Sequence, residues 1–195
     1  MLIENTVLSG FGASIGSVPA DVVSAGDTPN CVRNITFRNI SMPETGKGVY
    51  VKSNPDCRHP HAAARIQDIL FEDVAIIRPR WWAIWIGPQQ QHQPGGKLGQ
   101  DCALAYPIYK ACPTQGCVDF RNITLRNVSV ESPLISPGVI LGNSTNPMEV
   151  TFDGVRVSFA GDVVPPFPFG KQYRCNGTSL TLVPGSVNSP LPRCT

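Results

Sequence analysis

One pattern recurs five times along this chain of 195 residues and restricts what it can fold into. Each copy has apolar residues at alternate positions, then one Asn, Asp or Gly, after which the alternation resumes one residue out of step. Alternation indicates a strand with one buried face, and the slip indicates a bend whose two sides both point inward. Asn, Asp and Gly tolerate the left-handed backbone of such a corner. The copies are LIENTVL from Leu2, ITFRNISM from Ile35, ILFEDVAI from Ile69, ITLRNVSV from Ile123 and VTFDGVRV from Val150.

A second, shorter strand follows four of the corners, beginning near Ala13, Val49, Ala83 and Gly138. A strand, a one-residue corner, a strand and a loop, stacked coil on coil, describe an all-β parallel β-helix of about four to five coils. A β-sandwich also has many short strands, but the common register of the copies argues against it. We expect one domain, with the solenoid in residues 1–164 and a Pro-rich, loop-rich tail in 165–195 that packs on it or caps it.

The composition favours no charged partner. Charged residues make up 15% of the chain, and the net charge is +2. No basic run is present, so we expect no nucleic-acid partner. No apolar run approaches the ~18 residues of a membrane span, so we expect no membrane partner either. A soluble monomer is the expected state of the complete protein.

Seven cysteines indicate an oxidising compartment, where disulfides persist, and so a secreted protein. Because the number is odd, either one thiol is free or its partner lies outside these residues, and we favour the second. No Cys-x-x-Cys spacing occurs, and the cluster at residues 58–61 lacks a third ligand. We therefore expect no metal and no cofactor.

Six Asn-x-Ser/Thr sequons also suggest a secreted glycoprotein. Asn39 and Asn127 fall in the corner column, where stacked amides would be closed to glycosylation, so Asn143 and Asn176 are the better acceptors. The sequons begin at Asn34, Asn39, Asn122, Asn127, Asn143 and Asn176. Met1 opens directly into a strand without a signal peptide or a cap, so we expect the later part of a longer β-helix.

The segment SGFGASIGSVP (residues 9–19) and the strand KGVYVKS (residues 47–53) resemble glycoside hydrolase family 28, the polygalacturonases. In that family a Gly-His-Gly-x-Ser-Ile-Gly-Ser segment precedes an NITFRNI-type strand and then a strand ending Arg-Ile-Lys, in the same order as here. The resemblance runs from Met1 to about Gly161, and the tail with Cys175 and Cys194 is similar to the family's carboxyl-terminal end. It implies a right-handed single-stranded parallel β-helix that hydrolyses α-1,4-galacturonan by inversion.

Carried over by position, Gly12 matches a flanking glycine of the family, but Phe11 stands where the family has its active-site His. Lys52 matches the substrate-binding Lys, and Tyr50 replaces Arg. The family's catalytic aspartates lie upstream of the Gly-His-Gly segment, so this chain lacks them. We therefore predict no catalytic residue here.

The residues themselves agree, because inverting hydrolysis needs two carboxyl groups about 6.5 to 9.5 Å apart. The outward columns of the second strands contain none. We read those columns as Ser14, Tyr50, Trp85, Ile140 and then Gly16, Lys52, Gly87, Gly142. For Asp68, Glu72 and Asp73, on the first strand or its corner, we expect roles in the solvated face and in capping.

These columns could still bind sugar. Tyr50 and Trp85 on adjacent strands, about 4.8 Å apart, could form a platform for a pyranose ring. Lys52 beside them would supply the charge that a galacturonate carboxylate needs, and Gly12 and Ser14 complete the predicted substrate-binding set. The alternative is that Lys52 is merely solvated and that Trp81, Trp82 and Trp85 pack under the following loop.

The insertion at residues 88–117 holds three cysteines and is expected to wall the groove. His92 within it is read as solvent-facing. Two hypotheses remain: a fragment or divergent member of a pectin-degrading glycoside hydrolase, or a non-catalytic β-helix module that binds polysaccharide. A pectin lyase is a weaker third, because it would need a Ca²⁺ site or an Arg base that these columns do not offer.

Overall fold

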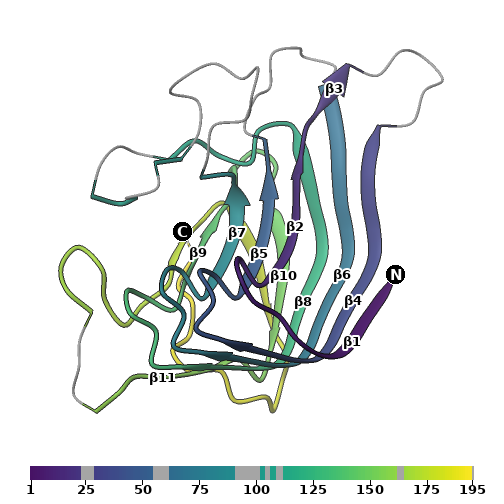
Figure 1. Ribbon diagram of the computed structural model, residues 1–195. Helices are drawn as coiled ribbons and strands as arrows, with labels where there is room; N and C mark the ends of the chain where they lie inside the picture. Colours follow the sequence, from purple (N-terminus) through teal and green to yellow (C-terminus); the bar gives the residue numbers. More distant parts are fainter. Residues whose placement is uncertain are drawn as a thin grey trace.

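The computed structural model describes residues 1–22, 29–54, 62–90, 102–103, 106–108, 112–161 and 165–194. Within these ranges the chain forms strands and turns and contains no helix, so none could span a membrane. Figure 1 shows two sheets of parallel strands that stack coil upon coil around a common interior. The predicted all-β architecture with parallel strands is confirmed.

The larger sheet runs in the order β1-β4-β6-β8-β10-β13. Its strands are β1 (Leu2–Val7), β4 (Asn30–Pro43), β6 (Ala62–Ile77), β8 (Val118–Glu131), β10 (Met148–Asp153) and β13 (Thr178–Leu182). Two short strands join it, β3 (Asp21–Val22) on β6 and β11 (Arg156–Ser158) on β8. The smaller sheet runs in the order β12-β9-β7-β5-β2. Its strands are β2 (Ala13–Val18), β5 (Val49–Ser53), β7 (Ile84–Pro88), β9 (Gly138–Leu141) and β12 (Arg174–Asn176).

The copies of the repeat lie in the predicted register. Ile35 pairs with Ile69, Ile69 with Ile123, and Ile123 with Val150. All four positions point toward the same interior, which an apolar cluster fills from end to end. Within that cluster Phe71 has no exposed surface, and its ring stacks on that of Phe37 with the centroids 5.1 Å apart.

The corners are made as the sequence predicts. Asn5, Asn39, Asp73, Asn127 and Gly154 all have positive φ angles, from 48° to 78°. The Asn39 amide donates to Oδ1 of Asn5 at 2.7 Å, and the Asn127 amide donates to Oδ1 of Asp73 at 2.6 Å. Side chains thus hydrogen-bond along the corner column, so the amide nitrogens of these two sequons are already engaged.

Two further corner columns were not predicted. Asn34, Asp68 and Asn122 form one with φ angles of 56°, 55° and 49°, and the Asn122 amide donates to Asp68 at 2.8 Å. The other consists of Glu44, Arg78 and Ser132, also with positive φ. The long strands β4, β6 and β8 therefore each bend twice, and a third bend follows at their ends.

A column of alternating charge lies beside the first corner column. Glu4, Arg38, Glu72, Arg126 and Asp153 stand in register on five neighbouring strands. Arg38 pairs with Glu4 at 2.5 Å, and Arg126 pairs with Glu72 at 3.1 Å and with Asp153 at 3.0 Å. Exposed pairs of this kind contribute little stability one by one. Their alternation favours the observed stacking of coils over a shifted one.

The smaller sheet corrects one position of the sequence-based alignment. Trp85 pairs with Val139, not with Ile140, so the fourth rung is shifted by one residue from the expected columns. Val139 then points outward with Trp85, while Ile140 lies in the solenoid interior. The apolar run at residues 138–141 has no alternation that could distinguish the two registers.

Beyond residue 164, β12 adds to the smaller sheet and β13 to the larger one. A disulfide joins Cys175 to Cys194 and another joins Cys102 to Cys112. Cys117 is also disulfide-bonded, whereas Cys31 is an exposed free thiol. The expected division at residue 164, and a partner for the odd cysteine outside this chain, stay predictions.

Candidate functional site

The candidate site lies on the outer face of the smaller sheet, at the turns that lead into β2, β5 and β7. The amide of Gly46 donates to the carbonyl of Gly10 at 2.6 Å, and the amide of Trp81 donates to that of Gly46 at 2.9 Å. The turns of three coils therefore stack directly. Two residues before the register-paired Ala13, Val49 and Ile84 come three side chains in one column, Phe11, Lys47 and Trp82.

Lys47 is the unusual member of this column. Its side chain is 3% exposed, and Nζ lies 3.8 Å from the ring centroid of Tyr50, 5.3 Å from Phe11 and 5.7 Å from Trp85. No carboxylate or hydrogen-bond acceptor among the described residues pairs with it. Burial, and to a lesser degree the neighbouring charge of Lys52, lowers the pKa of Lys47 to about 7.

Tyr50 and Lys52 follow on β5. The Tyr50 side chain is 5% exposed, and its hydroxyl accepts from the Gln90 amide at 3.4 Å. Lys52 is partly exposed, its Nζ lies 4.4 Å from the Tyr50 ring centroid, and burial lowers its pKa. The two lysines thus bring their ammonium groups to one aromatic ring, while substrate binding by Lys52 and Tyr50 stays a prediction.

Trp85 is placed differently from the expectation. It pairs with Tyr50 in register, but its indole has no exposed surface and donates to the carbonyl of Pro88 at 2.8 Å. It packs edge-on against Trp82 and Tyr106, in a second apolar cluster. An open platform of two rings is therefore not formed. The arrangement matches the alternative for Trp82 and Trp85, which pack beneath the insertion, whereas Trp81 is 44% exposed.

The first coil supplies the exposed side of the site. Phe11, at the position of the family's His, is 49% exposed and lies over Lys47. Ser14 is exposed and donates its hydroxyl to the Phe11 carbonyl at 3.0 Å. Gly12 has a φ of +68°, and a Cβ there would lie closer than 3.0 Å to the carbonyl oxygens of Gly48 and Lys47. Gly12 thus allows the first coil to approach the second where the site is built.

The strands of the smaller sheet carry no Asp or Glu. Among the described residues of the stacked turns, Glu44 supplies a carboxylate, which pairs with Arg78 at 2.8 Å and with Arg80 at 3.7 Å. Asp68 and Asp73 are at corners of the larger sheet, where their carboxylates accept from asparagine amides. Within the described residues, this face offers ammonium groups and no pair of acids.

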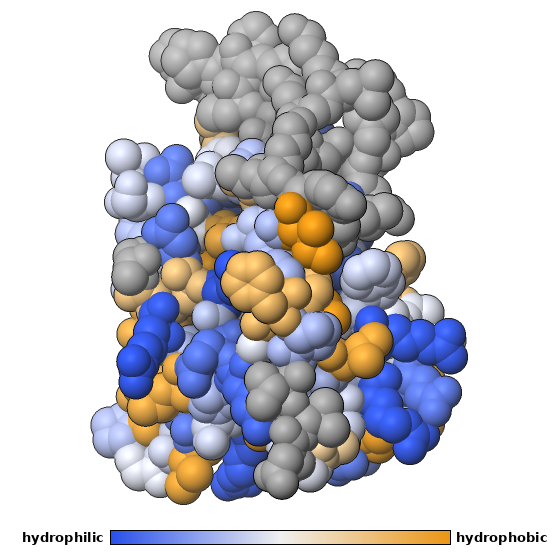
Figure 2. Space-filling model, turned by 90° about the vertical axis from the view of Figure 1, so that its left-hand side faces the viewer, coloured by the Kyte–Doolittle hydropathy of each residue, from blue (hydrophilic) through white to orange (hydrophobic). Residues whose placement is uncertain are grey.

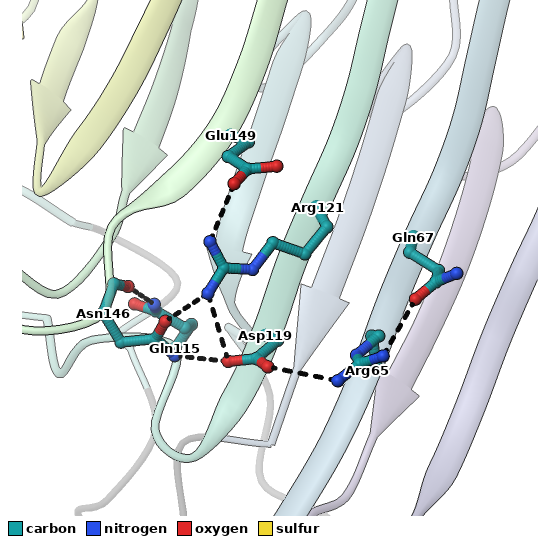
Figure 3. A network of polar contacts seen from close by, with 7 residues as sticks. All are labelled: Arg65, Gln67, Gln115, Asp119, Arg121, Asn146 and Glu149. Atoms are coloured by element: carbon teal, nitrogen blue, oxygen red, sulfur yellow. Dashed lines mark hydrogen bonds and ion pairs between the residues drawn. The ribbon is translucent and has the colours of Figure 1, made fainter.

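One end of the insertion is fixed between the two sheets. Gln115 is fully buried, its carbonyl accepts from the Ser53 hydroxyl at 2.9 Å, and its amide donates to the Asn146 carbonyl at 2.6 Å. Figure 3 shows the polar network that continues from there. The Asn146 amide donates to Asp119 at 2.8 Å, and Arg121 pairs with Glu149 at 2.8 Å. The insertion therefore returns to the solenoid at the edge of the strand that carries Lys52.

Two expectations fall outside the described residues, those for His92 and for the cluster at residues 58–61. Elsewhere in the described chain, no three residues of the His, Cys, Asp or Glu type come together as metal ligands.

Figure 2 shows the side of the molecule that faces left in Figure 1. Apolar side chains lie near its middle, with hydrophilic ones beside and below them.

The burial of Lys47 predicts how stability depends on pH. The folded state lowers the pKa of this ammonium from 10.5 to about 7, so the unfolded chain binds more protons between these values. Stability should therefore rise with pH across that window, by about 1.4 kcal/mol per pH unit at most, and this term should be constant below it. Urea unfolding of the wild type and of Lys47→Met checks this. Parallel pH profiles for the two proteins would contradict it.

Sequence reasoning named Phe11, Gly12, Ser14, Tyr50, Lys52 and Trp85, and the structure places them on neighbouring coils of one face. It missed Lys47, which precedes the strand and belongs to neither outward column. Aligning the turns of successive coils would have identified Lys47, because it precedes Val49 by two residues just as Phe11 precedes Ala13.

Comparison with known proteins agrees with this architecture. The family model described as glycosyl hydrolases family 28 matches residues 1–177. Searches of curated proteins and of solved structures returned no match. The matched range includes all the strands of the smaller sheet and every residue of the candidate site. This chain belongs to glycoside hydrolase family 28.

Proposed function

We propose that the outer face of the smaller sheet binds the uronate units of a galacturonan, as part of a polygalacturonase-like glycoside hydrolase. The observation that carries this proposal is the pair of ammonium groups on one aromatic ring. Nζ of Lys47 and Nζ of Lys52 lie within about 8 Å of each other, because they stand 3.8 and 4.4 Å from the Tyr50 centroid. In the part of the chain that the structure describes, this face has no acid to neutralise them.

A uronate unit fits such a face in two respects. Its carboxylate needs a cation, and the partly exposed ammonium of Lys52 supplies one. The C–H face of a pyranose ring needs an apolar surface, and the half-exposed ring of Phe11 is the accessible aromatic group beside the lysines. Gly12 and Ser14 border the same position on the first coil. Trp85 supports Tyr50 and Lys47 from beneath, without contacting the sugar.

Hydrolysis needs more than this face offers. Inversion requires an acid and a base about 6.5 to 9.5 Å apart, and the strands of this sheet contain neither Asp nor Glu. We therefore propose that this chain does not supply the acid and the base. The 195-residue chain by itself should bind galacturonan without releasing reducing ends.

The second candidate is a polysaccharide-binding β-helix without catalysis. Phe11 in place of the family's His and the missing acid pair favour it. The two candidates differ in one measurement, the release of reducing ends from polygalacturonate. Activity of the 195-residue chain would exclude the non-catalytic module and would contradict the absence of catalytic residues from this chain.

The binding proposal is tested by Lys52→Met, measured by calorimetry with trigalacturonate. Removing the accessible ammonium should weaken binding about tenfold or more. Lys171→Met is the matched control, because Lys171 lies over the ring of Phe159 and outside the proposed face. It should bind like the wild type. Equal affinity of the wild type for trigalacturonate and for its methyl ester would contradict the proposal, because the ester carries no charge.

Extracellular location is part of the same proposal. The two described disulfides and the disulfide-bonded Cys117 fit an oxidising compartment, where plant cell-wall polysaccharide would be met.

A further inference from the structure

We infer that Lys47 is a second carboxylate-binding residue, which together with Lys52 forms a two-ammonium receptor for one uronate carboxylate beside the ring of Phe11. This inference deepens the proposed function, which rests on Lys52 as the accessible cation. It adds a residue that neither the family resemblance nor the outward columns singled out.

The Lys47 ammonium is isolated from other polar groups. Lys47 is 3% exposed as a residue, yet no anion and no hydrogen-bond acceptor among the described residues pairs with its three N–H groups. Buried charged groups in proteins are normally paired, because burial without a partner is unfavourable. The contacts of Nζ recorded among the described residues are with the rings of Tyr50, Phe11 and Trp85. They attract the cation but leave its N–H donors available for a ligand.

The Lys47 ammonium lies close to solvent on one side. Of the three rings around Nζ, those of Tyr50 and Trp85 are 5% and 0% exposed. Phe11, at 49% exposed, is the ring of the three that borders solvent, so Nζ lies nearest to solvent on the Phe11 side. A Cβ at the preceding Gly10 would meet no atom within 4 Å, so open space adjoins this turn. A carboxylate could therefore approach Nζ from the Phe11 side.

The two cations have the Tyr50 ring as a common neighbour, which puts their Nζ atoms at most about 8 Å apart. Both sit at the ends of flexible four-carbon stems, and both lie against Tyr50. A carboxylate between them could accept a charge-assisted hydrogen bond of about 2.8 Å from each. Without an anion, the charge of Lys52 disfavours protonation of Lys47. With a carboxylate bound, that repulsion is compensated and Lys47 gains its proton.

Binding should therefore be coupled to proton uptake. With a pKa of about 7, Lys47 is mostly neutral in the empty protein at mildly alkaline pH. An anion that contacts Nζ raises this pKa, and the protein then takes a proton from the buffer. The number of protons can be measured by calorimetry in two buffers whose ionisation enthalpies differ. A purely structural Lys47 would leave this number at zero.

The experiment titrates trigalacturonate into the wild type, Lys47→Met, Lys47→Arg and Lys52→Met at about pH 8.5, chosen to lie above the pKa of Lys47. The wild type should take up close to one proton per ligand bound. Lys47→Met should lose this uptake and bind about tenfold more weakly or worse. Lys47→Arg should bind without uptake, because guanidinium remains charged at this pH. Lys52→Met should bind weakly but still take up a proton.

The outcomes separate the two proposals. If the wild type binds without proton uptake and Lys47→Met binds equally well, the receptor is wrong while Lys52 and the proposed function stand. If trigalacturonate does not bind the wild type, the proposed function fails. The side-chain NMR signals of Lys47, titrated with sodium galacturonate, then decide the receptor: a saturable shift supports it, and unchanged signals overturn it. Circular dichroism confirms that each variant is folded. Proton uptake by the wild type tests the receptor even if a variant does not fold.

Discussion

Gly12→Ala should destabilise the protein by about 3 kcal/mol or more, the large loss expected when a new side-chain atom meets rigid backbone. The added Cβ would lie closer than 3.0 Å to the carbonyl oxygens of Gly48 and Lys47 and to Sδ of Met42. Only the methionine could move aside easily. The first coil would have to separate from the second at the turn that carries Phe11, so binding of trigalacturonate should weaken as well.

Gly10→Ala is the matched control for this change. Gly10 also has a positive φ, of 63°, but a Cβ there would meet no atom within 4 Å. It should cost only the strain of an alanine in the left-handed region, about 1 to 2 kcal/mol. The free energy of unfolding of both variants, measured in urea, checks the comparison. Equal losses would show that conformation, not the contact between coils, makes glycine necessary at position 12.

Phe71→Ala should cost about 3 to 5 kcal/mol, the range for removing a buried aromatic ring. Phe71 has no exposed surface and stacks on Phe37, and it stands in register with Leu125 on the next coil. Coils on both sides of the cavity are held by their own backbone ladders, so the space cannot close fully. The loss should appear as a lower urea midpoint with fluorescence and circular dichroism changing together.

Phe71→Leu is the control for that prediction, since it keeps much of the volume and the apolar character of the site. It should cost about 1.5 kcal/mol or less. A loss as large as that of alanine would mean that the ring stack itself, rather than filled volume, stabilises the interior.

The solenoid was predictable because its signals are local and repeated. The corner asparagines at positions 5, 39 and 127 mark the repeat in the sequence. All three have the left-handed backbone that the pattern requires. The second and third corner columns were missed for opposite reasons. Around Asn34 and Asn122 the alternation of apolar and polar residues is less clear, so the bend leaves no visible slip in the pattern. Glu44 and Arg78 are residue types that rarely adopt positive φ.

The site was predictable only in part. Lys52 and Tyr50 could be placed because they occupy a regular strand that matches the family segment. The depth of Trp85 could not, since an outward-pointing side chain on a strand is buried or exposed according to what a distant insertion places over it. Lys47 was missed because turns between strands lack a two-residue period, so its neighbours follow from stacking of coils rather than from spacing within one coil.

Binding and hydrolysis are separable in this chain. The described face has the cations that a uronate needs and lacks the acids that its cleavage needs, so affinity and turnover depend on different parts of the protein. A chain that binds trigalacturonate strongly yet leaves it intact would agree with both halves of the proposal.

The alternating column from Glu4 to Asp153 limits how such a protein can change in length. Loss of the single turn of the spiral that contains Arg38 would bring Glu4 against Glu72, two like charges on adjacent rungs. Loss of two turns together would restore an acid beside a base. Duplication or deletion of an even number of coils should therefore be tolerated better than that of an odd number, because of this one row of surface side chains.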